Sequence, residues 1–468
     1  MSRSAHGSRM APQPDVTPSE LARAVPWVVR DATLAEVMNV LTSGTLLCAF
    51  AVALGASNTV VGLIAGVAPL FQVLQLPATA LVERLRRRKA VAFTAAVAGR
   101  VLWLVVAAAA LLPLGRGRVA VLLAALGLRA AVNAYYICAQ NSWMRDLIPD
   151  GSMGDFYARR MRASYLAGLL TGLAGGFLVD ATGRLGAAPT TGYAFLFVTA
   201  FVFGEAASLM MLRVPEPAMP PPTVARLAPR LMAPVRDGNY RRFLLYLGAW
   251  NLTTGMATPL FTIYLLRRLG YPLAWVVLLE AAGKLAHLFT LGIWGRLADK
   301  HSSRAVVAAA QPLYWVSLLL WPVAGLLGPA TPLTLVLIAG IFVVNRTAAA
   351  GIGIGNNTLA MQLAPRGRAT PYLAVRSLVM NPVTFIAPVL GGAAADLLGR
   401  VPALARVGAL DIVLVSAALV GVLSAVLLRG VTQEGAAPLR TLGADFVTDT
   451  CARLAALGAR LSPRRARG

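Results

Sequence analysis

Several ionisable side chains interrupt long apolar runs of this 468-residue sequence, where a charge is costly and needs a partner or a function. Four of them, Arg129, Glu280, Lys284 and Arg346, lie at comparable depth in three of these runs. Together they carry an excess of positive charge, so a cavity that they share would favour an anionic or carboxylate-bearing solute. Two alternatives stay open: Glu280 could carry a coupling proton, or it could neutralise Lys284 as a structural i, i+4 pair.

The spacing of the polar residues favours helices that turn one face toward such a cavity. Glu280, Lys284 and His287 are spaced i, i+4, i+7, as are Arg129, Asn133 and Tyr136, and polar stripes of this length do not face lipid. Glu36 and Arg100 lie shallower in their runs and form a predicted pair. The predicted substrate-binding residues are Arg129, Asn133, Tyr136, Trp250, Asn251, Thr254, Lys284 and Arg346, and the predicted proton-coupling residues are Glu280, Glu36 and His287.

The composition explains why the elements that position these residues must be transmembrane helices. The chain is 57% hydrophobic and only 13% charged, which leaves too little polar surface to cover a soluble globule. Its net charge of +24 lies in short gaps between apolar runs, so it sets topology, and we expect no nucleic-acid partner. The three cysteines, Cys48, Cys138 and Cys451, are far apart and predict neither a disulfide framework nor a metal site.

Twelve apolar stretches have the length of about 20 residues that is needed to cross a bilayer. They cover residues 31–54, 60–81, 90–112, 119–143, 156–179, 193–212, 243–266, 273–297, 306–327, 333–361, 372–398 and 412–428. The sequence therefore predicts an all-α integral membrane protein of two six-helix halves, 27–213 and 241–429. A linker, 214–240, and two tails, 1–26 and 430–468, are predicted to lie in the cytoplasm. The second tail has near-helical apolar spacing that suits either a helix on the inner leaflet or a disordered segment.

The positions of lysine and arginine predict the orientation. Within these bounds the loops after the even-numbered spans hold 16 of these residues, against 7 in the loops after the odd-numbered spans. Because short cytoplasmic loops carry the excess of positive charge, both termini are predicted to lie in the cytoplasm of a cell whose inner membrane holds the protein.

An internal repeat relates the two halves. At an offset of 216 residues, 141–184 pairs with 357–400 without a gap, and eleven of the 44 pairs are identical. They include a proline, four glycine pairs, two arginine pairs and the pair Asp180 and Asp396, which shared low complexity does not produce. Two parallel repeats with a site between them are a recurring transporter architecture.

The loop after the eighth span reads Gly295-Arg-Leu-Ala-Asp299-Lys300-His-Ser-Ser-Arg304, and its equivalent in the first half contains Glu83, Arg84 and Arg88. These residues resemble the signature of the major facilitator superfamily. The resemblance covers all but the tails and implies alternating access, with Glu83, Arg84, Arg88, Asp299, Lys300 and Arg304 as a conformational latch. The glycine-rich motif of proton antiporters in that family is incomplete here, because the fifth span, 156–179, lacks its proline. The family motif that would include Arg129, in the fourth span, 119–143, matches only weakly.

The predicted function is therefore secondary active transport of a small solute, coupled to protons, by a monomer in contact with membrane lipid. Export of amphipathic drug-like compounds and a transporter-fold sensor are the alternatives. No nucleophile–base spacing, metal-ligand motif or phosphate-binding loop points to an enzyme, and no cofactor is predicted.

Overall fold

The computed structural model describes residues 11–13, 16–112, 115, 117–148, 153–219, 232, 234–328, 331–365, 369–402, 408–433, 443 and 445–453. The side chains of 153–155, 157–158 and 369–371 lie outside this description. Within the described residues the chain is helical, and its single bridge pairs Gln13 with Pro217.

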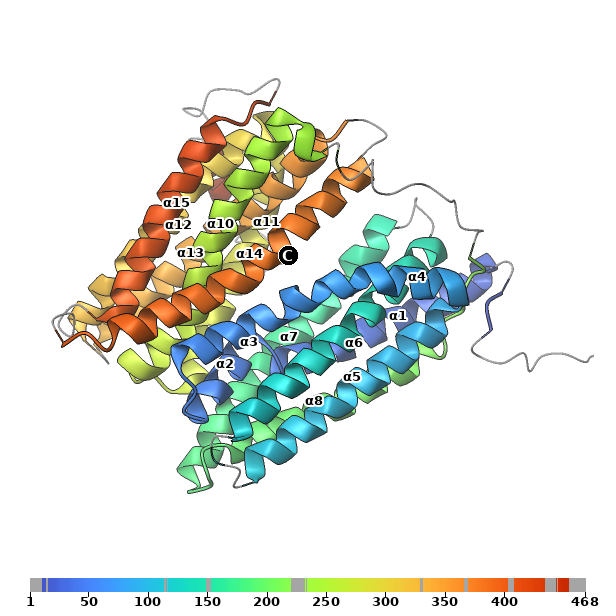
Figure 1. Cartoon of the computed structure of the whole chain (residues 1–468), viewed down its shortest axis with the longest axis horizontal. Helices are drawn as coiled ribbons and strands as arrows, with labels where there is room; N and C mark the ends of the chain where they lie inside the picture. The colour runs from blue at the N-terminus through green and yellow to red at the C-terminus, as the bar shows by residue number, and fades with distance from the viewer. Residues whose placement is uncertain are drawn as a thin grey trace, which may run out of the picture. The chain divides into compact units, whose positions relative to one another are not determined.

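The first half of the sequence forms nine helical segments (Figure 1). They are α1 (Pro18–Leu41), α2 (Gly44–Ala53), α3 (Asn58–Phe71), η1 (Gln72–Leu74), α4 (Gln75–Leu85), α5 (Arg88–Leu111), α6 (Gly117–Leu147), α7 (Met153–Arg184) and α8 (Thr191–Met211). The predicted first span is broken at Thr42 and Ser43, between α1 and α2, and the second is interrupted by the short η1.

The second half forms α10 (Gly238–Ile263), η3 (Tyr264–Arg268), α11 (Leu273–Lys300), α12 (Ser303–Leu327), α13 (Pro332–Gln362), α14 (Ala369–Leu398) and α15 (Ala409–Arg429). A further helical stretch covers 445–453. Helices of the described residues cover all twelve predicted spans, and eleven of these helical stretches are long and apolar enough to cross a membrane. The remaining span, α10, is less apolar because it carries Asn251, Thr253 and Thr254.

The first helix starts earlier than the sequence suggested. The expected boundary of the N-terminal tail was residue 26, but α1 begins at Pro18 behind a complete capping box. The Thr17 hydroxyl accepts a hydrogen bond from the Glu20 N–H, and the Glu20 carboxylate accepts one from the Thr17 N–H. Pro26 lies inside this helix. As a consequence, Asp31 lies well inside α1 and not at its beginning.

The contacts divide the chain into two compact units that differ from the predicted halves. Unit 1 contains residues 1–225, 258–277 and 384–400, and unit 2 contains 226–257, 278–383 and 401–468. Unit 1 therefore combines the first half with three helix ends from the second half: the end of α10, the start of α11 and the end of α14.

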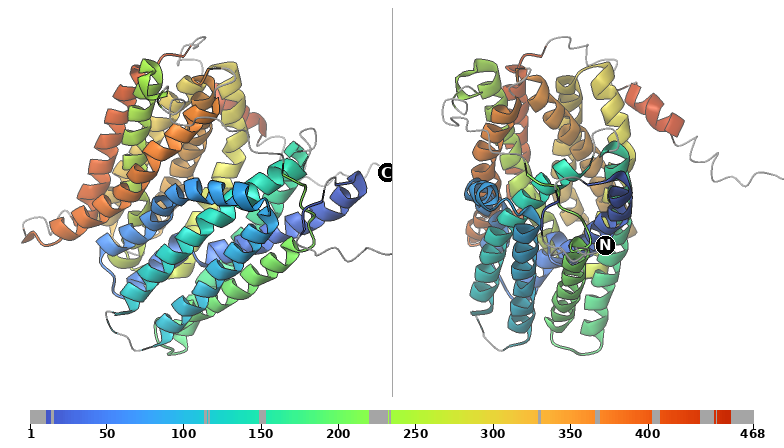
Figure 2. Two further views of the ribbon diagram at one scale, coloured as in Figure 1. Left: turned by 45° about the vertical axis from the view of Figure 1, so that its right-hand side comes forward. Right: turned by 90° about the vertical axis from the view of Figure 1, so that its right-hand side faces the viewer.

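Each unit has its own helix packing. In unit 1, α5 packs along α6 and α8, and α1 packs along α7 and α8. Its core holds an aromatic cluster in which Trp103 stacks on Phe197 at 5.7 Å and Phe50 meets the same ring edge-on at 4.9 Å. In unit 2, α12 packs along α13 and α15. Both sets of helices can be followed in Figure 1 and from two further sides in Figure 2.

Candidate functional site

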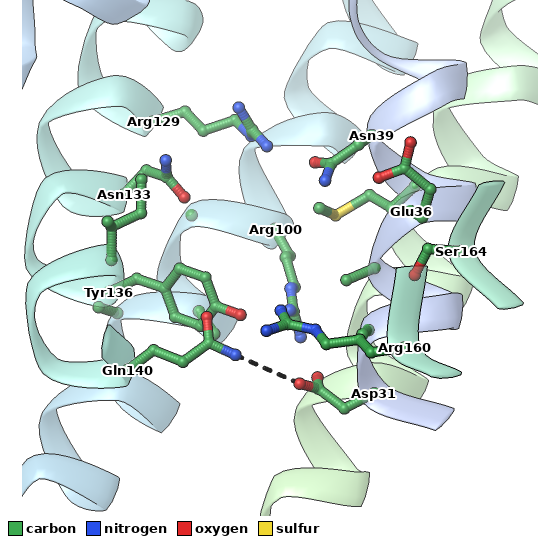
Figure 3. Close-up of a pocket in the computed structure, with 17 residues that line it drawn as sticks. Asp31, Glu36, Asn39, Arg100, Arg129, Asn133, Tyr136, Gln140, Arg160 and Ser164 are labelled. Carbon is green, nitrogen blue, oxygen red and sulfur yellow. Dashed lines mark hydrogen bonds between the residues drawn. The ribbon is translucent and has the colours of Figure 1, made fainter. Parts of the chain in front are cut away.

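A polar cavity of about 300 Å³ lies among α1, α5, α6 and α7 of unit 1 (Figure 3). Its polar lining consists of Asp31, Glu36, Asn39, Arg100, Arg129, Asn133, Tyr136, Gln140, Arg160 and Ser164. The three arginines and two acids give it a formal charge of +1. A charged cavity of this size within apolar helices is the default candidate for the binding site of a polar solute.

Arg129 is a cavity cation whose guanidinium has no hydrogen-bond partner among the described residues. It comes from α6, and its guanidinium carbon lies 4.7 Å from the centre of the Trp103 ring, a cation–π contact that holds the side chain in place. It makes no hydrogen bond or ion pair with the described residues, and Figure 3 shows it reaching into the cavity. Its five N–H donors are therefore available to a solute.

Asp31 is the buried acid of the cavity. The residue is 3% exposed, and its Oδ2 accepts one long hydrogen bond of 3.3 Å from Gln140 Nε2. Its Oδ1 has no hydrogen-bond partner among the described residues. Figure 3 shows Arg160 reaching toward it from α7. Burying a carboxyl group with so few hydrogen bonds is costly, so this position is a candidate for a functional role.

Arg100, in contrast, is held by the protein. It is 4% exposed, and its guanidinium donates to the Gly204 carbonyl and the Ser208 hydroxyl on α8. A methyl group on Gly204 would lie 3.1 Å from the Arg100 Cδ, so the glycine is what allows this close approach. Arg100 also lies over the Tyr136 ring at 5.8 Å and so fixes one wall of the cavity.

The structure brings together four of the predicted residues, Arg129, Asn133, Tyr136 and Glu36. Glu36 has space because its neighbour on α7 is Gly168, where a methyl group would lie 3.3 Å from the Glu36 Cγ. Sequence reasoning missed Asp31 and Arg160 as cavity residues. Hydropathy places Asp31 and Arg160 near the edges of the first and fifth spans. The capping box at Thr17 and Glu20 was the signal that could have moved Asp31 into the interior of its helix.

A second ionic group lies in unit 2. Glu280 Oε2 is 4.0 Å from Lys284 Nζ, and Glu280 Oε1 is 3.8 Å from Arg346 Nη2, so one acid bridges two cations. His287 Nδ1 lies 3.1 Å from the Arg346 carbonyl oxygen. The predicted grouping of these four side chains is thus present within the unit. Arg129 belongs to unit 1 and these side chains to unit 2. That they share one cavity stays a prediction.

The predicted α10 residues pack within unit 2. Trp250 is 7% exposed and meets Tyr314 edge-on, with ring centres 4.9 Å apart. Asn251 Nδ2 donates to the Leu247 carbonyl oxygen, and the Thr254 hydroxyl donates to backbone oxygens of its own helix. Their role in substrate binding stays a prediction.

The predicted latch residues of the first half have unequal environments. The Arg88 side chain is fully buried; it pairs with Asp146 of α6 and donates to the Pro217 carbonyl oxygen at 2.6 Å. Its backbone N–H donates to Glu216 Oε1. Glu83 and Arg84 are exposed and make no hydrogen bond or ion pair with the described residues. Arg88 therefore joins α5 to α6 and to the segment that follows α8.

Of the predicted latch residues of the second half, Lys300 contacts the C-terminal helix at 445–453. Lys300 Nζ and His301 Nε2 lie 2.8 and 2.7 Å from Asp445 Oδ2, and Arg304 N–H donates to Gln433 Oε1. Asp299 is exposed and makes no hydrogen bond or ion pair with the described residues. The predicted latch role of these residues stays a prediction.

The contacts of the C-terminal helix on α11 follow an antiparallel register. Asp445 meets Lys300, Asp449 meets Arg296 at 2.8 Å, and Arg453 lies over Gly292, where a methyl group would be 2.6 Å from its Nη2. Phe446 also packs on the Trp294 ring at 4.4 Å. Each step of about one turn along one helix is thus matched by one turn along the other.

Reversing the two acidic charges of this helix should release it. One exposed ion pair contributes little by itself, so both are removed together: Asp445→Lys with Asp449→Lys should raise the rate of limited proteolysis within 445–453 several-fold. Adding Arg296→Asp and Lys300→Asp should restore protection by exchanging the charges.

The hydrogen bonds from Lys300 and His301 hold the pKa of Asp445 below its usual range, so docking should persist at neutral pH and weaken only as the pH falls through that lowered pKa. Equal proteolysis of all variants would mean that the ion pairs do not hold the helix.

Among the described residues no group of three or more histidines, cysteines or acids is arranged to hold a metal ion. The site is therefore described by its arginines, acids and amides alone.

Comparison with known proteins places this arrangement in a wider context. The model of the Major Facilitator Superfamily matches residues 32–388. No curated protein matches the sequence.

Solved structures show the same fold at low identity. A mutant form of the nucleoside transporter NupG aligns at a TM-score of 0.68 and 12% identity, over 88% of this chain and 100% of that chain. The D-xylose-proton symporter aligns at 0.64 and 14%, over 89% and 98%. A POT family transporter in complex with 5-aminolevulinic acid aligns at 0.63 and 13%, over 91% and 99%.

The family model covers most of the chain, and these neighbours are transporters that share its helical architecture. The chain is therefore a multi-pass membrane transporter, not an enzyme, and it belongs to the Major Facilitator Superfamily.

Proposed function

We propose that this protein is a proton-coupled secondary transporter of a small carboxylate-bearing solute, which it moves by alternating access. The observation that carries the proposal is the Arg129 guanidinium, fixed on Trp103 and directed into a cavity of net positive charge without a hydrogen-bond partner among the described residues. Carboxylates match the planar fork of a guanidinium with two parallel hydrogen bonds.

The amide groups of the cavity suit the same solute. Asn39 and Asn133 lie on the Arg129 side of the cavity in Figure 3, where they can accept or donate hydrogen bonds to the polar remainder of a substrate. A cavity lined so largely by charged and amide groups disfavours a purely apolar compound, which would have to desolvate them. The alternative of an exporter of amphipathic drug-like compounds is less well supported for this reason.

Asp31 is the residue that we assign to the coupling proton. The geometry that supports this assignment is the burial of Asp31, whose Oδ1 has no hydrogen-bond partner among the described residues. Exposure to water during the transport cycle, or pairing with Arg160, would favour release of that proton. Glu280 lies within 4.0 Å of two cations, which supports a role in neutralising them. Glu36 and His287 remain further candidates for coupling.

The remaining features of the proposal concern the setting of the protein. The excess of lysine and arginine in alternate loops supports an inner-membrane location with both termini in the cytoplasm. Lipid and protons would be its other partners, and a monomer suffices because a single chain supplies both six-helix repeats.

A screen by thermal stabilisation of the purified protein tests the substrate class. The probes are carboxylates, each paired with its neutral amide, so that shape is matched and charge differs. We expect stabilisation by members of the carboxylate set, with smaller or no shifts for their amides. Stabilisation by amides and carboxylates alike, or by cations only, would contradict an anionic substrate.

A further inference from the structure

Two aspartates at equivalent positions of the internal repeat make the same contact in unit 1. Asp180 lies near the end of α7 and Asp396 near the end of α14, 216 residues later. Asp396 Oδ1 accepts a hydrogen bond of 3.0 Å from the Asn58 N–H, and its Oδ2 accepts bonds of 2.8 and 2.6 Å from the Thr59 N–H and hydroxyl. Asn58 and Thr59 are the first two residues of α3.

Asp180 repeats this geometry on α11. Its Oδ1 accepts a hydrogen bond of 3.1 Å from the Leu273 N–H, and its Oδ2 accepts one of 2.8 Å from the Ala274 N–H. Leu273 and Ala274 are the first two residues of α11. In both cases a carboxylate binds the first two free N–H groups of a helix, where the helix dipole also favours negative charge.

These contacts differ from ordinary helix caps because each joins the two halves of the sequence. A cap normally comes from the residue that precedes its own helix. α3 already has one, since the Ser57 hydroxyl accepts a hydrogen bond from the Val60 N–H. Asp396 is thus an additional partner, supplied by a segment more than 300 residues away in the sequence.

Glycines bring the paired helices close beside each aspartate. A methyl group on Gly392 would lie 2.1 Å from the Asn58 carbonyl oxygen, and one on Gly62 would lie 2.1 Å from the Pro388 carbonyl oxygen. At the other pair, a methyl group on Gly176 would lie 3.2 Å from the Ala274 Cα. The glycines therefore let the backbones of the paired helices approach closely beside each aspartate.

Water can reach one of the two contacts directly. A hollow of about 410 Å³ is lined by Ser57, Thr59, Asp396 and Arg400. Hydrogen bonds to a carboxylate beside water can be exchanged for hydration when the helices part, so the contact is reversible rather than permanently buried.

We propose that Asp180 and Asp396 are paired positioning residues of the transport cycle, which hold closed the end of the protein where α3 and α11 begin. Alternating access requires that end to open in one state and close in the other. The repeat supplies an equivalent aspartate contact to each helix pair, α3 with α14 and α7 with α11. We therefore expect the two aspartate contacts to break together when this end opens. On α11, the contact with Asp180 lies at the first residues of the helix, whereas Asp299 of the signature loop lies at its last turn.

The experiment measures access to the cavity from each side of the membrane. A reporter, Ser164→Cys, is placed in the cavity wall of a variant whose Cys138 and Cys451 are replaced by serine. Right-side-out and inside-out vesicles are treated with a membrane-impermeant methanethiosulfonate. From the side where α3 begins, Asp180→Asn and Asp396→Asn should each raise the labelling rate about threefold to tenfold, since asparagine has one acceptor oxygen instead of two and loses the charge.

The double variant should raise that rate further and lower labelling from the opposite side. Asp237→Asn is the matched control, because Asp237 Oδ1 accepts from the N–H groups of Asn239 and Tyr240 at the start of its own helix. Asp237→Asn should change the stability of the protein but not the sidedness of labelling, by which we mean the ratio of the labelling rates from the two sides of the membrane. Thr59→Val removes only the hydroxyl donor to Asp396 and should give a smaller rise in the same direction.

Unchanged sidedness in both single variants and in Thr59→Val would overturn the proposal and leave the aspartates as static caps. Equal sidedness changes in Asp237→Asn would overturn it as well. Neither result depends on the identity of the transported solute, so this test stands apart from the proposed carboxylate specificity. If the double variant does not fold, the labelling rates of the two single variants decide whether the aspartates hold this end closed.

Discussion

Asp31→Asn is expected to abolish accumulation driven by a pH gradient while leaving solute exchange across the membrane intact. The variant mimics the protonated acid and retains an oxygen that can accept the hydrogen bond from Gln140. A carrier that cannot release its proton can still bind and exchange solute. In the wild type, a gradient of one pH unit could drive about tenfold accumulation if one proton moves with each solute. In Asp31→Asn the same gradient should drive no accumulation. Exchange and net uptake in proteoliposomes measure the two activities separately.

Stability gives an independent check on Asp31. Because its Oδ1 has no hydrogen-bond partner among the described residues, removing the charge should leave the melting temperature unchanged or raise it. Loss of a structural ion pair would lower it instead. Glu280→Gln is the matched control, since this acid bridges Lys284 and Arg346. We expect that variant to keep pH-driven accumulation. If coupling is lost in Glu280→Gln and kept in Asp31→Asn, the assignment of the proton is wrong.

Arg129→Gln is expected to weaken carboxylate binding the most of any single change in the cavity. A charge-assisted hydrogen bond contributes about 1.5–3 kcal/mol, so the loss should be roughly tenfold to more than a hundredfold in affinity. Arg129→Lys keeps the charge but loses the planar fork, and its binding should fall between the two. Isothermal titration with a carboxylate that stabilises the wild type measures both variants.

The Arg129 variants also separate recognition from folding. The guanidinium contacts the Trp103 ring at 4.7 Å, and replacing it with glutamine removes a cation–π contact of about 0.5–2 kcal/mol. A modest fall in melting temperature is therefore expected alongside the loss of binding. If Arg129→Gln binds carboxylates as tightly as the wild type, the arginine does not recognise the solute.

The sequence allowed the fold to be predicted because the bilayer imposes its own length on every span. A run of about 20 apolar residues between charged loops has few structural alternatives, and the repeat at 216 residues indicated two related halves. The interruptions at Thr42 and Ser43 and at Gln72–Leu74 were not predicted. Apolar composition sets where a span lies but not where the backbone bends within it.

The site was predicted only in part, for a similar reason. Helical spacing on α6 correctly grouped Arg129, Asn133 and Tyr136, because one face of one helix can be read from one sequence. Asp31 was missed because hydropathy places charged residues at span edges, whereas α1 extends to Pro18. Contacts between helices far apart in the chain, such as Asp396 with Asn58, depend on packing that no local pattern encodes.

The most direct test of the central claim is a proton measurement made during solute transport. Purified protein is reconstituted into vesicles that contain a pH-sensitive dye, and a carboxylate that stabilises the protein is added outside. We expect the internal pH to change upon addition in wild-type vesicles, with little change for the matching amide and none in Asp31→Asn, which should still exchange the labelled carboxylate. Solute entry without a pH change would contradict proton coupling, and binding without any entry would contradict transport of that solute.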